Sequence, residues 1–415
     1  MKVPILGTRK IFYGWIIVMA STCVTCTGFG ILYSFSVFFK SWIGEWASSR
    51  AALSAVFSLA FITYGLVSIV MGWLTDRYGP RRVLTAGGVI MAAGAFLTAF
   101  CREMEFLFIT WGIMVAIGVG TCYSPTAATV SKWFVHRKGM AMGTIVSGIG
   151  LGTLVFSPLS EHLIQSYGWR TAIFVVGLIA LTVYVFAALI IRGSPEEMGL
   201  EPLRASAAHE HENGCGTTDP GDFAPSMSVS QAMRTRNLWF LFAIHGLWTI
   251  GLAVCLSHFV PYATDLGIKT TTAAAMLGSV GAMSILGRLS LGVLTEQWGV
   301  RRSIVIILSS QAVSMLLPII GSSPWILWIF VLAFGFGYGG LASIFPLATA
   351  EFFGTRSMGS LFGILLLGST IGGSVGPLLA GSVFDLTGSY RYAFISCVIF
   401  MGMGIALAAG VKKTA

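Results

Sequence analysis

The chain has 415 residues, of which 55% are hydrophobic and only 10% are charged, whereas soluble globular proteins carry about 25% charged residues. This number of charged residues is too small to solvate the surface of a soluble protein of this size. Most of the surface must therefore face lipid. The net charge of +9 would suit a nucleic-acid-binding protein, but the basic residues lie in short clusters between apolar segments, where membrane topology accounts for them. The composition therefore excludes a soluble protein and a nucleic-acid partner, and it indicates a polytopic membrane protein.

Twelve apolar segments are long enough to cross a hydrocarbon core about 30 Å thick. In chain order they are 11–39, 51–74, 82–101, 105–133, 138–162, 169–192, 238–264, 271–296, 303–321, 324–352, 357–384 and 391–411. They do not alternate apolar and polar residues, which excludes an outer-membrane barrel. We therefore predict an all-α integral membrane protein with two six-helix bundles, residues 1–192 and 237–415, joined by a cytoplasmic linker at 193–236.

The basic residues predict the orientation of these segments. Of the 25 Lys and Arg residues, 18 lie at the two termini and in the even-numbered connections, and six lie in the odd-numbered connections. By the positive-inside rule both termini are cytoplasmic. We expect a multi-pass protein of the cell membrane, with the bacterial inner membrane as its location.

The remaining basic residue, Arg288, lies inside the eighth apolar segment. An arginine at the centre of a membrane helix costs about 2.5 to 3.5 kcal/mol, so it is expected to face a watery cavity or a partner. The alternative is that it extends to the cytoplasmic edge near Glu296, but eight residues of helix span about 12 Å, which exceeds its comfortable reach. We therefore favour a functional role for Arg288.

The two halves of the chain carry copies of the same loop. Residues 72–82 (GWLTDRYGPRR) match residues 292–302 (GVLTEQWGVRR) at an offset of 220, and Pro125 matches Pro346 at an offset of 221. Internal repeats of this kind are typical of secondary transporters, which hold their substrate between the halves near the middle of the membrane.

The 72–82 loop resembles the loop signature of the major facilitator superfamily. Within that superfamily, the motifs at 13–15 (YGW), 36–39 (SVFF) and 133–143 resemble those of monocarboxylate transporters and their bacterial oxalate/formate relatives. The resemblance extends over essentially the whole chain. It implies a carrier that alternates between two states.

The repeated loops place charges at helix ends on the cytoplasmic face. There, pairs of carboxylate and guanidinium groups can close one state and release in the other. The alternative role is topology determination by positive charge alone, and the two roles are compatible. The residues assigned to this conformational latch are Asp76, Arg77, Arg81, Arg82, Arg137 and Glu296.

A planar guanidinium binds a carboxylate through two parallel hydrogen bonds, so Arg288 suits an organic anion. The resemblance implies the same role, because monocarboxylate transporters carry an arginine at this place. The mammalian members also have an aspartate at the position of Ser284, which we include among the substrate-binding candidates, and a lysine near the position of Tyr33. Residues 357–384 contain no Lys or Arg, unlike the oxalate carriers, and one fixed cation favours a monoanion such as L-lactate, pyruvate, acetate or propionate.

Other cavity residues are predicted from position and resemblance. Tyr123 and Tyr338 lie in matching glycine-rich stretches, where their hydroxyls can bind a carboxylate or a 2-hydroxyl; aromatic packing is the alternative. The resemblance implies that Leu32 and Ile149 are apolar walls and that Tyr33 lies nearby.

His258 is the best titratable candidate for proton coupling because imidazole changes charge near neutral pH, although a hydrogen-bonded interfacial histidine is an equal alternative. Arg288 alone is a second route to coupling. The run Gly148–Gly152, with its counterpart Gly368–Pro377, predicts close helix packing. The stretch Gly335–Gly340 fits a dinucleotide-binding pattern, but it lies inside an apolar segment and follows no strand.

We therefore expect a symporter that carries a small monocarboxylate and a proton, with no metal or cofactor and no obligatory protein partner. Anion exchange of the oxalate/formate type and a non-transporting membrane sensor are the alternatives. An enzyme is disfavoured because no pair of carboxylates, metal-ligand cluster or activated nucleophile occurs at membrane depth.

Overall fold

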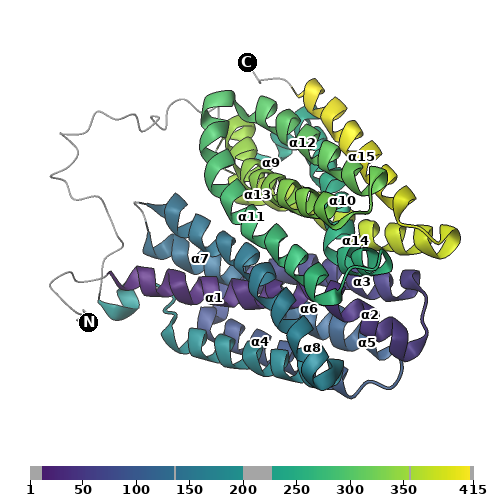
Figure 1. The fold of residues 1–415 in the computed structure, drawn as a ribbon. Helices are drawn as coiled ribbons and strands as arrows, with labels where there is room; N and C mark the ends of the chain where they lie inside the picture. Colours follow the sequence, from purple (N-terminus) through teal and green to yellow (C-terminus); the bar gives the residue numbers. More distant parts are fainter. Residues whose placement is uncertain (1–11, 135–136, 200–226, 355–356, 412–415) are drawn as a thin grey trace, which may run out of the picture.

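The computed structural model describes residues 12–134, 137–199, 227–354 and 357–411 (Figure 1). The N-terminal half contains α1 (Tyr13–Tyr33), α2 (Phe35–Trp46), α3 (Arg50–Tyr78), α4 (Pro80–Ala99), α5 (Phe106–Ile109), a π-helix (Thr110–Val115), α6 (Ala116–Gly120), α7 (Ser124–Trp133) and α8 (Lys138–Ile190). The C-terminal half contains α10 (Arg236–Asp265), α11 (Thr270–Trp298), α12 (Val300–Ile320), α13 (Pro324–Phe353), α14 (Met358–Thr387) and α15 (Arg391–Gly410). The short helix α9 (Val229–Met233) precedes α10, and most of the predicted linker, residues 200–226, lies outside the described residues.

The described residues confirm the predicted twelve-helix membrane fold. Eleven helical segments are long and apolar enough to cross a membrane, with α1 and α2 forming one span and α5 to α7 another. The longest, α8, consists of two helices that meet at Gly168, where φ is 80° and the backbone leaves the helical region. Counting α8 twice gives the twelve spans predicted from the apolar segments.

The 220-residue repeat is visible in the backbone. Gly79 and Gly299 end α3 and α11 at φ values of 82° and 79°, a conformation that favours glycine. Two residues later, Arg81 donates to the carbonyl of Ile191 at 2.7 Å, and Arg301 likewise donates to the carbonyl of Ala409. In each half, this arginine ties the third helix to the end of the sixth.

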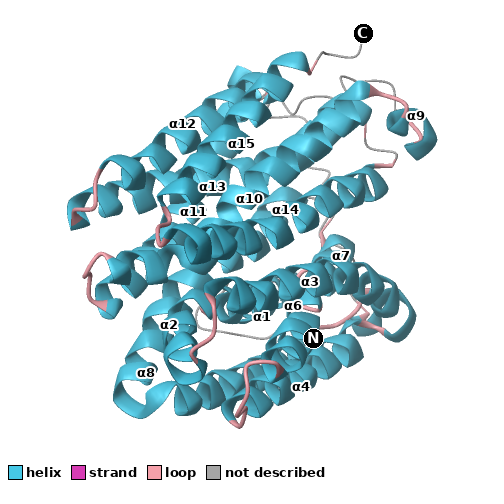
Figure 2. Ribbon diagram, turned by 90° about the vertical axis from the view of Figure 1, so that its right-hand side faces the viewer, coloured by secondary structure: helices cyan, strands magenta, loops and turns pink. Residues whose placement is uncertain are grey.

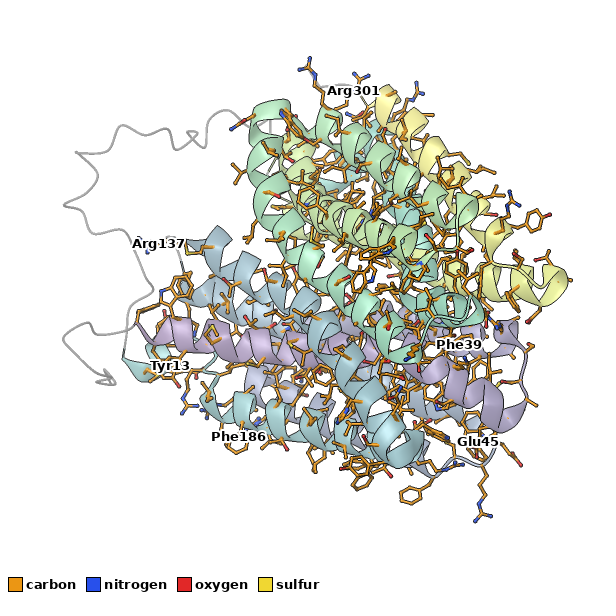
Figure 3. The ribbon with its side chains drawn as sticks, viewed as in Figure 1. Tyr13, Phe39, Glu45, Arg137, Phe186 and Arg301 are labelled. Atoms are coloured by element: carbon orange, nitrogen blue, oxygen red, sulfur yellow. The ribbon has the colours of Figure 1, made fainter. Side chains whose placement is uncertain are left out.

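The termini define the two ends of the helix bundle. We call the end at which α1 begins and α15 ends the terminal face, and the opposite end the far face. In Figure 3, Tyr13 and Arg137 lie at the terminal end of the N-terminal half, and Phe39 and Glu45 lie at its far end. Large apolar side chains such as Phe186 point away from the bundle and are exposed, as expected for a lipid-facing surface.

Figure 2 shows the helices of the two halves stacked one set above the other. The halves pack together through glycines on the far-face side of the bundle centre. A Cβ atom added to Gly150 on α8 would lie 2.6 Å from the carbonyl oxygen of Gly281 on α11, and one added to Gly281 would overlap with the carbonyl of Gly150. On the other side of the interface, Gly381 of α14 packs against the Ser54 hydroxyl of α3. Close packing is also confirmed at Gly148, where an added Cβ would lie 2.7 Å from the Thr22 carbonyl oxygen on α1.

On the terminal side, the same helices are apart. Cβ atoms added to Gly143 on α8, Gly292 on α11 or Gly363 on α14 would have no neighbouring atom within 4 Å. A cavity of about 70 Å³ lies between α3 and α14, lined among others by Tyr64 and Gly363. The halves are therefore closed at the far face and open toward the terminal face.

The glycine contact between α8 and α11 gives a test of this arrangement. Alanine has the better helix propensity, so Gly281→Ala does not weaken α11, but its methyl group would collide with the Gly150 carbonyl. We expect the state with a closed far face to be destabilised by about 1 to 3 kcal/mol relative to the state with an open far face, as for overpacked cores. Spin-label distances between Gly44→Cys and Leu386→Cys, one far-face position in each half, are expected to lengthen. Gly402→Ala, where the added Cβ meets open space, is the control and is expected to change nothing.

Candidate functional site

Arg288 lies at the interface between the two halves. Only 8% of its surface is exposed, its Nη1 donates to the carbonyl of Val146 on α8, and its Cζ lies 5.4 Å from the ring centroid of Tyr338 on α13. Among the described residues, its Nε has no hydrogen-bond partner and no carboxylate forms an ion pair with it. The guanidinium therefore faces the protein interior and not lipid, and it keeps donors free for an anion.

The crossing of α11 and α13 positions this arginine. A Cβ atom on Gly339 would overlap with the Ser284 carbonyl, so the two backbones are in contact one helical turn from Arg288. Ser284 itself is fully buried and its hydroxyl donates to the Gly281 carbonyl at 2.8 Å. Its Oγ faces α8, where a Cβ on Gly150 would lie 2.7 Å away.

Three tyrosines lie near the guanidinium, and a fourth lies near these three. Tyr338 is in ring contact with Arg288, Tyr33 lies close to both Tyr338 and Arg288, and Tyr123 lies close to Arg288. Tyr64, on α3, lies in the vicinity of the other three phenols. We call Arg288 and these four tyrosines the tyrosine-arginine cluster. It brings polar hydroxyls from α1, α3, the α6–α7 connection and α13 to one cation.

The structure brings together four of the predicted residues, namely Arg288, Tyr33, Tyr123 and Tyr338. Of the predicted apolar walls, Leu32 is fully buried next to Tyr33, and Ile149 is half-buried next to the Gly150 crossing. Sequence reasoning missed Tyr64, for which the only available signal was a tyrosine in the middle of the second apolar segment.

His258 forms no described hydrogen bond with the tyrosine-arginine cluster. It is buried near the far end of α10, where Nδ1 lies 3.0 Å from the Tyr390 hydroxyl and Nε2 lies 3.0 Å from the Ser54 hydroxyl and 3.1 Å from the Pro377 carbonyl oxygen. A carbonyl only accepts, so Nε2 carries the proton and Nδ1 accepts from Tyr390. Ser54 belongs to the N-terminal half, so the imidazole bridges the two halves.

Arg50, which sequence reasoning counted only as a loop cation, forms the centre of the far-face contact. Its Nη1 lies 2.6 Å from Asp265 Oδ2 and donates to the Tyr390 hydroxyl at 2.8 Å, and its Cζ lies 3.7 Å from the Phe384 ring centroid. Asp385 accepts from the backbone amides of Arg50 and Ala51 at 3.0 and 2.8 Å.

The two oxygens of Asp385 therefore cap the first turn of α3 from the other half, where the helix dipole favours an anion. Together with the histidine contacts, these interactions close the far face. We call this set the far-face lock. It consists of Arg50, Ser54, His258, Asp265, Asp385 and Tyr390.

The predicted latch residues lie at the terminal face without a described contact across the halves. Asp76 lies 3.5 Å from Lys132 of its own half, and Arg77 lies over the rings of Trp73 and Tyr78. Arg82 and Arg137 are exposed and Arg81 binds the end of α8, as described above. The side chain of Glu296 lies outside the described residues.

Comparisons with known proteins agree with this architecture. The sequence profile of the Major Facilitator Superfamily matches residues 18–373 and 255–414. Monocarboxylate transporter 13 of Bos taurus is 26% identical over 394 residues, which cover 94% of this chain and 88% of that protein. Monocarboxylate transporter 12 of Homo sapiens is 26% identical over 434 residues, covering 97% and 81%. Monocarboxylate transporter 4 of Rattus norvegicus is 26% identical over 392 residues, covering 92% and 79%.

A solved structure shares the fold at low sequence identity. The bacterial homolog of the human lysosomal transporter Spinster, in an inward-facing and unoccupied conformation, aligns with a TM-score of 0.74 and 16% identity over 96% of this chain and 97% of that one. At this identity the likeness concerns the fold alone.

Proposed function

Because the chain belongs to the major facilitator superfamily and is a membrane transporter and not an enzyme, we propose that it carries small monocarboxylate anions together with a proton. The predicted orientation puts the terminal face in the cytoplasm. The carrier is then open to the cytoplasm, with its far-face lock formed on the outside.

The observation that carries this proposal is the environment of Arg288. A buried guanidinium without a carboxylate partner among the described residues carries a desolvation cost that a bound anion would offset. Because Arg288 also donates to Val146 of the other half, an anion bound there would act on the contact between the halves. Binding and alternating access would then depend on the same side chain.

The substrate class follows from charge and polarity. One guanidinium with free donors matches one carboxylate, and α14 supplies no second cation for a dicarboxylate. The phenols of Tyr33, Tyr64, Tyr123 and Tyr338 offer hydroxyls to a 2-hydroxyl or 2-oxo group, so L-lactate and pyruvate suit the cluster better than acetate or propionate. The names of the similar transporters support the same class.

The latch residues complete the proposed cycle. When the far face opens, α8 and α11, and likewise α3 and α14, approach at the terminal face. The exposed charges of Asp76, Arg77, Arg82 and Arg137 are then available for pairs across the halves. In the state described here, the far-face lock holds the two halves together at the opposite end.

Arg288 and His258 each contribute to proton coupling. Arg288 couples if the anion neutralises it and the proton travels by water or on the substrate. His258 accepts from Tyr390 in the closed lock, so a proton on its Nδ1 would replace that acceptor with a second donor. External pH would thus act on the lock through this ring.

Uptake into proteoliposomes tests the proposal. With an inward proton gradient and no internal anion, we expect labelled L-lactate to accumulate and an internal pH dye to report acidification. Unlabelled pyruvate is expected to compete, and oxalate to compete poorly because its second charge has no partner.

The alternatives give different results in the same vesicles. An exchanger of the oxalate/formate type would take up label only after preloading with an anion. A non-transporting sensor would bind the anion, as seen by thermal stabilisation, without uptake under either condition. Either result would overturn proton symport.

A further inference from the structure

A carboxylate buried between the halves takes no part in the site described so far. Glu161 lies on α8, with 3% of its surface exposed, one helical turn before the exposed Gln165 near the far face. The Gln165 amide donates to Glu161 Oε1 at 2.8 Å and to the Thr270 hydroxyl of α11 at 3.4 Å. This short chain of side chains crosses from one half to the other.

The surroundings of Glu161 offer a carboxylate few polar partners. On α11, Thr270 contacts Gln165 and Gly278 packs against Pro158. The stretch of α11 between these two contacts contains Ala273, Ala274 and Leu277, which are all fully buried. In the described part of the chain, the carboxylate receives a single hydrogen bond and forms no ion pair. Burial of an unpaired carboxylate is costly, whereas a protonated carboxyl needs only hydrogen-bond partners.

No charged group on the elements packed against α8 forms a described ion pair with Glu161, and Arg170 of α8 pairs with Glu45 of α2. His162 on the same helix, Lys40 on α2 and Lys269 at the start of α11 are all exposed, and α1 carries no Asp, Glu, Lys, Arg or His. The remaining neighbours, α4 and α7, carry their basic residues at the terminal face.

Buried hydroxyls lead from Glu161 toward the bundle centre. Thr153, Ser157 and Glu161 recur every fourth residue on α8 and therefore share one face of the helix, with Ser160 beside them. Ser157 and Ser160 are fully buried, and their Oγ atoms have no hydrogen-bond partner among the described residues. Buried hydroxyls without a protein partner are free to bind ordered water. This stripe of hydroxyls reaches Ile149 and the crossing next to Arg288.

We infer that Glu161 is a proton-binding site and that Thr153, Ser157 and Ser160 connect it by water to the tyrosine-arginine cluster. The inference rests on the proposed proton-coupled function. When the far face is open, outside water reaches Glu161 and solvates its carboxylate. A proton taken up from the outside medium converts the carboxylate into a carboxyl group, which then fits between α8 and α11 as the far face closes. In the closed state the proton passes to water on the hydroxyl stripe and leaves through the open terminal face.

The first test measures proton movement and exchange separately. In proteoliposomes, Glu161→Gln is expected to lose the stimulation of labelled uptake by a proton gradient and the associated internal acidification. It is expected to keep counterflow exchange, which needs no net proton transfer. Glu45→Gln, which removes an exposed carboxylate at the same end, is the control and is expected to keep all three activities.

The second test needs no substrate, so it still reports on Glu161 if the chain carries a different solute. Spin labels at Gly44→Cys and Leu386→Cys are expected to show more of the closed far face at acid than at alkaline pH. With Glu161→Gln, the closed population is expected to dominate at both pH values. Infrared spectra of the wild type should contain a protonated-carboxyl band that Glu161→Gln lacks.

The proposal is overturned if Glu161→Gln retains gradient-driven acidification at the wild-type ratio of protons to acid. It is also overturned if the label distances of the variant respond to pH as those of the wild type do. Ser157→Ala combined with Ser160→Ala is expected to keep the pH response of the distances but lose gradient-driven uptake; unchanged uptake would contradict the hydroxyl stripe.

Discussion

Arg288→Ala is expected to abolish binding of monocarboxylates and therefore both uptake and exchange. The variant removes the one cation of the tyrosine-arginine cluster, and the phenols of Tyr33, Tyr123 and Tyr338 are neutral donors that do not replace a charge. Breaking a buried pair of opposite charges costs about 3 to 5 kcal/mol, which corresponds to a dissociation constant at least about 100-fold weaker.

Arg288→Lys separates charge from geometry. Lysine keeps the positive charge but lacks the planar fork that gives two parallel hydrogen bonds to a carboxylate. Losing one charge-assisted hydrogen bond costs about 1.5 to 3 kcal/mol, so we expect affinity about 10- to 100-fold below the wild type, between wild type and alanine.

Thermal unfolding with and without ligand measures this loss directly. A ligand at 100 times its dissociation constant stabilises the folded protein by about 2.7 kcal/mol, and a 100-fold weaker variant at the same concentration gains only about 0.4 kcal/mol. Arg102→Ala, at an exposed loop arginine, is the matched control and is expected to bind as the wild type. Unchanged stabilisation and uptake in Arg288→Ala would refute the binding role of Arg288.

The fold was predictable from the sequence because its main determinants are local. Apolar length defines each span, and the repeated loop with Gly79 and Gly299 fixes where matching helices end. Some spans differ in form. The fifth and sixth spans run on as α8 without an intervening loop, the first is divided into α1 and α2, and the fourth contains α5, a π-helix, α6 and α7. Close packing at Gly148 was likewise predictable, since a glycine run inside a span serves few other purposes.

The cluster around Arg288 was predictable only in part. An arginine inside a span is conspicuous because burying its charge in the membrane costs free energy, and the matching glycine-rich stretches drew attention to Tyr123 and Tyr338. Tyr64 has no such mark, since a tyrosine in a span is usually a packing residue. Its place in the cluster follows from the way α3 crosses the bundle, which no sequence pattern encodes.

The far-face lock was not predictable because its partners are far apart in the chain. Arg50 and Asp265 are separated by 215 residues, and Arg50 and Asp385 by 335. In the sequence each looks like an ordinary loop charge. For His258, the residue was identified but its contacts were not, because they depend on how α10 meets α3.

Arg50→Ala is expected to shift the carrier toward the state in which the far face is open. The substitution removes the ion pair with Asp265, the hydrogen bond to Tyr390 and the contact with the Phe384 ring. The backbone amide of residue 50 still donates to the Asp385 carboxylate, so this cap of α3 is retained.

Asp265 is partly exposed, and such pairs are worth less than buried ones, so we expect a loss of about 2 kcal/mol. This loss corresponds to a change of about 30-fold in the ratio of the two states. Asp385→Asn is expected to act in the same direction by weakening the cap on α3.

Label distances between Gly44→Cys and Leu386→Cys measure the shift without reference to the substrate. In the wild type we expect a main population at the short distance of the present structure, and in Arg50→Ala a main population at a longer distance. Gradient-driven uptake is expected to fall because the far face closes only rarely, while L-lactate affinity in detergent changes far less than in Arg288→Ala. Arg391→Ala, at an exposed arginine at the same end, controls for loss of charge alone. If Arg50→Ala kept the short distance, the glycine contacts between α8 and α11 would suffice to close the far face, and the lock would be incidental to it.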